Sequence, residues 1–207
     1  MIFVSRIPEE DSLGRRFVAL MWGIAAGVFV FASAIVAYAL VHDLVQLRRD
    51  GTDWIYDIAF YVMAAVLYGR GARMEQIGAL ALACVMAIAG FHTLYDLWDK
   101  VLNPRPIQPL VLGFSALTSA GFGFLVVWLL LPFRASTNPL IEATWLSARN
   151  AMIVSAAYAS VTFFARLASS RMVEYGLDLF AAALCFQTAF IITRDALRDP
   201  RLKGDKA

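Results

Sequence analysis

The chain has 207 residues, of which 60% are hydrophobic and only 16% charged, and its formal net charge is +2 at pH 7. Soluble domains are typically about 45–50% apolar, so this composition excludes an ordinary water-soluble globule and predicts an integral membrane protein. The small net charge gives no support for nucleic-acid binding.

Six apolar stretches follow one another along the chain, and each is a candidate membrane-spanning helix because about 20 apolar residues cross a bilayer. They cover residues 17–41, 54–69, 77–95, 110–133, 150–165 and 179–193. We expect a charged turn at 47–53 and a polar loop at 134–144. The fifth stretch should extend back through Trp145, with Arg149 reaching toward the membrane surface. The sequence therefore predicts an all-α polytopic membrane protein with six transmembrane helices in one bundle.

Polar residues mark the two ends of this domain. We expect residues 1–16 to form a cytoplasmic N-terminal tail, residues 17–198 the six-helix transmembrane domain, and residues 199–207 a basic C-terminal tail. Six spans place both termini on one side, and that side would hold twelve of the eighteen lysines and arginines. Because cytoplasmic loops are rich in positive residues, we expect both termini in the cytoplasm, at the inner membrane of a bacterium.

Two carboxylates lie where the second apolar stretch begins. Asp53 and Asp57 are four residues apart, so on a helix they share one face and offer oxygen ligands to a divalent cation. In the alternative interpretation, Asp53 caps the helix and Asp57 pairs with a nearby arginine. A carboxylate inside a bilayer is costly unless it faces a cavity or a partner, so Asp57 predicts a compensating group beside it.

A second pair of candidate ligands lies near the end of the third stretch. His92 and Asp96 are also four residues apart, and one nitrogen and one oxygen on a single helix face suit zinc. The alternative is a structural His–Asp pair at the membrane surface. No Ser–His–acid or Cys–His arrangement stands out, so we expect no enzyme activity.

Small residues predict two packing features. Gly121 and Gly123, in the fourth stretch, are expected to lie against a neighbouring helix because glycine lets helix backbones approach closely. The two cysteines, Cys84 and Cys185, lie in different stretches and are expected to be buried and unpaired.

Four short motifs between Asp53 and Asp195 carry a family resemblance. They are Tyr68-Gly69 with Arg73 and Glu75; Tyr95-Asp96 with Leu102-Asn103-Pro104 and Pro106; Trp145-Leu146-Ser147 with Arg149-Asn150; and Tyr175-Gly176-Leu177-Asp178. In this order and spacing, the chain resembles the cation diffusion facilitators, six-helix membrane exporters of zinc and other divalent metals. It looks like a short, divergent member without the family's C-terminal cytoplasmic domain.

The resemblance implies proton-coupled export of a divalent metal cation by a homodimer in a lipid bilayer. Zinc, manganese, cobalt or iron would be the transported substrate, and no permanently bound cofactor is implied. The family binds metal with one His/Asp pair on the second helix and one on the fifth. On the second helix the pair falls either on Asp53 and Asp57 or on Phe60 and Ala64.

The fifth helix offers a second class of function. There the family's slots fall on Ala151 and Ser155, and alanine cannot bind metal while a neutral serine is a poor ligand. These two residues favour the alternative, a non-transporting membrane scaffold or partner subunit that keeps the fold and has lost the metal site.

Overall fold

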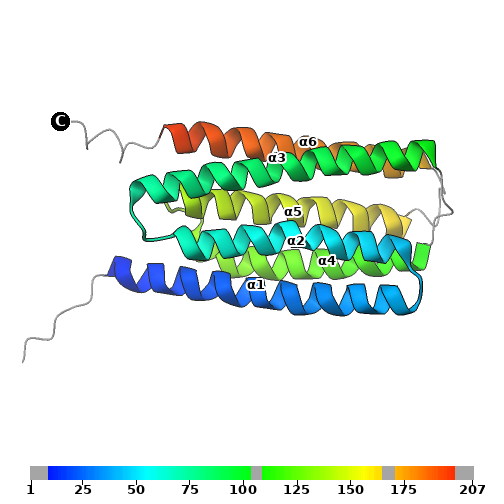
Figure 1. Ribbon diagram of the computed structural model, residues 1–207, viewed down its shortest axis with the longest axis horizontal. Coiled ribbons are helices and arrows are strands. Elements are labelled where there is room, and N and C mark those ends of the chain that lie inside the picture. The colour runs from blue at the N-terminus through cyan, green and yellow to red at the C-terminus, as the bar shows by residue number, and fades with distance from the viewer. Residues whose placement is uncertain (1–8, 104–108, 165–170, 199–207) are drawn as a thin grey trace, which may run out of the picture.

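The structure, a computed structural model, describes residues 9–103, 109–164 and 171–198. In this part the chain is helical and has no strand. Its elements are α1 (Glu9–Val41), α2 (Val45–Leu67), α3 (Ala72–Leu102), α4 (Pro109–Leu130), a short 3-10 helix η1 (Leu131–Phe133), α5 (Pro139–Phe164) and α6 (Arg171–Leu197). The long helices lie side by side in one elongated bundle (Figure 1). The predicted all-α bundle is confirmed.

The helices alternate in direction, so the bundle has two distinct ends. α1 begins and α6 ends at the same end, which we call the terminal end (Figure 1). α3 ends and α6 begins at the opposite end, which we call the far end.

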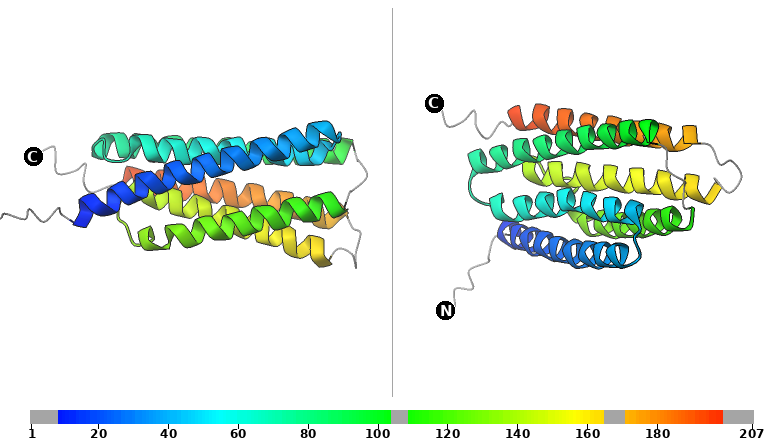
Figure 2. Two further views of the ribbon diagram at one scale, coloured as in Figure 1. Left: turned by 90° about the horizontal axis from the view of Figure 1, so that it is seen from below. Right: turned by 45° about the vertical axis from the view of Figure 1, so that its right-hand side comes forward.

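One helix lies inside the bundle. α5 contacts α2, α3, α4 and α6, whereas α1 and α6 lie at opposite edges (Figures 1 and 2). A helix surrounded by other helices meets little lipid, so it can carry polar side chains at membrane depth. This position explains why α5 tolerates Arg149 and Asn150 near its middle; Arg149 donates to the Asn150 side-chain oxygen at 3.3 Å.

The length and hydropathy of its helices identify the protein as an integral membrane protein. Among the described residues, four helical segments are long and apolar enough to cross a bilayer: Leu13–Val41, Ala72–Leu102, Ala116–Phe133 and Arg171–Leu197. α2 contributes a shorter apolar segment, Trp54–Leu67. Membrane crossing by α2 and α5 stays a prediction, because polar residues at the start of α2 and within α5 lower their hydropathy.

The predicted charged turn at 47–53 is wrong. Those residues form the first turns of α2, and the chain instead turns at 42–44, where Asp43 has a φ of +53°. Leu47 is only 3% exposed and packs with α1. Gly51 is also buried there, and a Cβ on it would lie 2.7 Å from the Val36 side chain. A helix that combines charged residues with a packed face is easily mistaken for a turn.

Two further boundaries differ from expectation. α1 begins at Glu9, inside the stretch expected as a tail, and α5 begins at Pro139, inside the expected loop 134–144. Asn138 explains the early start of α5, because its side-chain oxygen accepts a hydrogen bond from the Leu140 N–H at 3.0 Å. Asparagine before proline is a favoured helix start. The expected basic tail at 199–207 lies outside the described residues.

The small residues give a mixed outcome. Gly123 is closely packed, since a Cβ there would lie 3.2 Å from the Met152 backbone of α5, as expected. Gly121 is exposed, and a Cβ added to it would have nothing within 4 Å, so the expectation for Gly121 is wrong.

Both cysteines are free, but Cys84 is exposed and Cys185 is half-buried, so their predicted burial is wrong. Cys84 lies on an outer face of α3, a position that hydropathy alone does not reveal.

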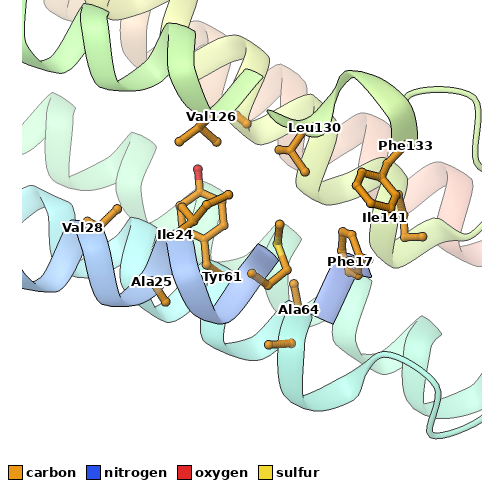
Figure 3. Packing of buried hydrophobic residues seen from close by; sticks show 13 residues of the cluster. Phe17, Ile24, Ala25, Val28, Tyr61, Ala64, Val126, Leu130, Phe133 and Ile141 are labelled. Carbon is orange, nitrogen blue, oxygen red and sulfur yellow. The ribbon is translucent and has the colours of Figure 1, made fainter. Parts of the chain in front are cut away.

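The main apolar core lies toward the terminal end. Thirteen buried residues from α1, α2, α4, η1 and α5 form it, among them Phe17, Tyr61 and Phe133 (Figure 3). The Phe17 ring packs against Tyr68 at 5.1 Å and against Phe133 at 5.4 Å between ring centroids. Tyr61 directs its hydroxyl toward Val126 of α4 (Figure 3). This core holds the ends of α1 and α2 against the α4–α5 connection.

Candidate functional site

Asp57, near the middle of α2, borders two cavities inside the bundle. The smaller, about 90 Å³, is lined by residues of α1, α2, α4 and α5. The larger, about 170 Å³, is lined by residues of α2, α3, α5 and α6. Asp57 and Ala151 line both cavities, so α2 and α5 separate them at this level.

Aromatic side chains and a few hydroxyl groups line the smaller cavity. Trp54 lies on its wall and stacks against Phe31 of α1 at 4.9 Å and Phe122 of α4 at 6.1 Å between centroids. Tyr61, Ser119 and Ser155 are the hydroxyl-bearing residues of the lining. This cavity therefore offers Asp57 three hydroxyl groups among aromatic and apolar side chains.

The larger cavity carries more polar side chains, but several of these are engaged in the fold. Asn150 donates to the Thr188 hydroxyl of α6, and Thr93 donates to the Ala89 carbonyl at 3.0 Å. Ser147 contacts the Met86 sulfur at 3.3 Å. These bonds satisfy polar groups of α3, α5 and α6 within the bundle, where water is scarce.

Two ionisable side chains and a thiol complete the larger cavity. Asp57, His92 and Cys185 come from α2, α3 and α6. The His92 ring packs 5.8 Å from the Tyr56 ring, which fixes its position beside α2. Asp57 and His92 are therefore the pair of predicted metal ligands that faces a common space.

Asp57 has no hydrogen bond or ion pair within the described residues. An ionised carboxylate in such surroundings loses hydration and is stabilised only by a proton, a cation or an imported polar group. The predicted pairing of Asp57 with an arginine is therefore not seen in the part of the chain that the structure describes. A carboxylate placed beside open space and without a protein partner is the arrangement of a ligand-binding group.

The other predicted ligands lie elsewhere. Asp96 lies one turn beyond His92 on α3 and lines neither of these cavities. Asp53 belongs to α2, but its side chain lies outside the described residues. No three His, Cys, Asp or Glu side chains of the described chain are close enough to hold one metal ion. Joint metal binding by Asp53, Asp57, His92 and Asp96 therefore stays a prediction.

The two positions on α5 that the family resemblance assigns to metal ligands lie opposite Asp57. Ala151 and Ser155 line the smaller cavity together with it. In the other register, Phe60 is 2% exposed and Ala64 is packed in the core of Figure 3. On α2, Asp57 is thus the residue whose chemistry suits a cavity, whereas Phe60 and Ala64 serve packing.

Sequence reasoning named Ser155 as a site position but assigned no site role to the other polar residues that α5 contributes. Ser147, Asn150 and Ser155 follow one another at spacings of three and five residues, and all of them line one of the two cavities. Their helical periodicity is a usable signal for an inward face. All three residues lay inside the expected fifth helix, but the sequence did not show which face of that helix turns inward.

The fold and the site define a class: an α-helical integral membrane protein with a carboxylate between two internal cavities. The chain matches no protein-family model and no curated protein. Its resemblance to the cation diffusion facilitators accordingly stays an expectation based on the motifs.

Proposed function

We propose that this protein transports a divalent metal cation across the membrane and that Asp57 is its principal ligand. The observation that supports this proposal is the unpartnered Asp57 carboxylate between the two cavities. The motif resemblance to the cation diffusion facilitators supports the same substrate class. Zinc, manganese, cobalt and iron are the candidate metals.

The proposed chemistry needs one carboxylate that binds either a metal or a proton. His92 borders the larger cavity with Asp57, and its imidazole is a suitable second ligand. Ser155 supplies a hydroxyl on the smaller cavity, and water completes the coordination. A carboxylate reached in turn from each cavity exchanges metal for protons, which is the logic of alternating access.

The setting of this transport is part of the proposal. Both termini lie in the cytoplasm, in the inner membrane of a bacterium, and two chains form a homodimer. The uneven distribution of lysine and arginine supports this orientation. The larger cavity would then hold the bound ion at membrane depth, enclosed by α2, α3, α5 and α6.

A non-transporting scaffold or partner subunit is the second candidate function. Two observations favour it: the described residues gather no three-ligand metal cluster, and Ala151 and Ser155 face Asp57 in place of stronger ligands. In this case Asp57 would be protonated and structural. The two candidates differ in whether the wild-type protein binds metal at all.

Calorimetric titration of the purified protein with each metal separates the candidates. Transport predicts binding that Asp57→Asn abolishes and His92→Ala weakens, because the first removes the charge and the second removes a nitrogen ligand. Asp195→Asn is the matched control, since Asp195 pairs with Arg194 on the surface of α6 and lines neither cavity. Metal uptake into proteoliposomes should follow the same order.

The opposite results are equally informative. Absence of binding by wild type to zinc, manganese, cobalt and iron at millimolar concentration would exclude the transport proposal and leave the scaffold. Loss of binding in His92→Ala with full binding in Asp57→Asn would move the site to α3.

A further inference from the structure

A polar cluster at the far end joins three of the four helices that enclose the larger cavity. Lys100 of α3 contacts Asp178 of α6 at 2.8 Å and Glu174 of α6 at 3.3 Å. Tyr158 of α5 donates its hydroxyl to the other Asp178 oxygen. Asp178 is only 4% exposed, so its charge depends on these partners. We call Lys100, Tyr158, Glu174 and Asp178 the far-end cluster.

The far-end cluster continues the lining of the larger cavity along each helix. On α3, Lys100 lies seven residues, two turns, beyond Thr93. On α5, Tyr158 lies one turn beyond Val154, and on α6, Asp178 lies three residues before Ala181. Residues at these spacings share a helix face. The cluster therefore lies on the inward faces of α3, α5 and α6, directly toward the far end from the cavity.

The terminal end is closed by a different kind of contact. There Glu75 accepts hydrogen bonds from the Gly69 N–H at 3.0 Å and from the Asn138 amide at 2.9 Å, tying two connections together. Large apolar side chains fill the space beneath, among them Phe60, Leu82 and Leu140. At the far end a buried apolar cluster lies between α1 and α2, whereas α3, α5 and α6 are joined there by the far-end cluster.

We propose that the far-end cluster is a gate, which closes the larger cavity to the far-end side when Lys100 and Tyr158 are bonded to Asp178. Breaking either contact weakens the link between α3, α5 and α6 at that end, where the Tyr175 hydroxyl still donates to the Lys100 carbonyl at 3.3 Å. A gate of this kind is a two-state element, and any ligand that competes for Asp178 shifts it toward the open state. The inference does not depend on which ligand the cavity binds.

Cys185 provides a direct probe of the gate, because it lines the larger cavity. The experiment uses Cys84→Ala protein, since Cys84 is exposed and would react independently. Membrane vesicles of both orientations are treated with a membrane-impermeant thiol reagent, and the labelling rate of Cys185 is measured. The side that exposes the far end is identified with His42→Cys in a background lacking both native cysteines, because His42 is exposed in the α1–α2 turn.

Lys100→Met and Tyr158→Phe should each raise Cys185 labelling from the far-end side. We expect an increase of about ten-fold or more for Lys100→Met, which corresponds to a shift of about 1.4 kcal/mol in the closed–open equilibrium. Tyr158→Phe removes one hydroxyl and should give a smaller increase in the same direction. Labelling from the terminal-end side should not change.

Two controls separate a gate from a general loss of structure. Asn138→Ala breaks the polar contact with Glu75 at the terminal end and should leave far-end labelling at the wild-type rate. The double variant Lys100→Asp, Asp178→Lys reverses the ion pair and should return labelling toward the wild-type rate. A merely structural cluster would not show rescue confined to one side of the membrane.

Several results would overturn the gate. They are wild-type labelling in folded Lys100→Met and Tyr158→Phe, an equal increase from both sides, or no rescue by the charge reversal. If Lys100→Met does not fold, Tyr158→Phe alone decides, since it removes the hydroxyl that donates to Asp178 and keeps the ring. One-sided labelling changes in a protein that binds no metal would support the gate while excluding the proposed metal transport, so the two proposals fail separately.

Discussion

The two halves of the bundle are built on different physical principles. The half toward the terminal end is closed by interlocking apolar side chains around Phe17 and by hydrogen bonds that Glu75 accepts between two connections. The larger cavity lies near the middle of the bundle, and the half beyond it, toward the far end, carries an ion-pair cluster centred on Asp178 beside a smaller apolar cluster between α1 and α2. Close packing resists rearrangement, whereas an ion pair can exchange one partner for another as long as the buried Asp178 carboxylate is not left without one. In the proposed gate, the terminal half is the fixed frame and the far half is the part that moves.

The largest expected effect tests the fixed frame. Phe17→Ala should lower the free energy of unfolding by about 3–5 kcal/mol, because it leaves a cavity in the packed core. Phe17 is 0% exposed and contacts both Tyr68 and Phe133. Denaturant titration in detergent micelles measures the change. Phe29→Ala is the matched control on α1, since Phe29 is 59% exposed and should matter little. Equal losses for both variants would contradict the assignment of the core.

A smaller effect sharpens the contact between α4 and α5. Gly123→Leu should destabilise by about 1–3 kcal/mol through overpacking against Met152. Gly121→Leu is the control on the same helix, because Gly121 faces open space and should be neutral. Thermal unfolding of the two variants under identical conditions distinguishes them. A lower melting temperature for Gly121→Leu than for Gly123→Leu would show that α4 is rotated relative to α5.

The smallest expected effect concerns the polar contact at the terminal end. Asn138→Ala removes the cap of α5 and a hydrogen bond to Glu75, and should cost about 1–2 kcal/mol of unfolding free energy. Asn103→Ala serves for comparison, because the Asn103 side chain bonds Asp99 in an exposed position and its loss should be nearly silent. A stability change in Asn103→Ala as large as that in Asn138→Ala would remove the contrast between the two ends.

Residues near α2 show where prediction from sequence succeeded and failed. The apolar run after Trp54 drew attention to Asp57, since an ionisable side chain inside an apolar helix is rare and costly, and Asp57 does border both cavities. The same reasoning placed a turn at 47–53, because it weighed local charge and ignored the packed face formed by Leu47 and Gly51. An amphipathic helix is recognised only when both of its faces are considered.

The sequence by itself determined that this chain is α-helical, that it has apolar helices suited to a membrane, and that Asp57 lies within an apolar stretch. These properties depend on composition and on neighbours a few residues apart. Only the tertiary structure decided that Asp57 shares a cavity with His92 while Asp96 does not. Likewise, it alone joined Lys100 to Asp178, 78 residues further along the chain. The physical reason is that helix rotation and helix pairing are set by packing among distant segments, for which one sequence carries no local periodic signal.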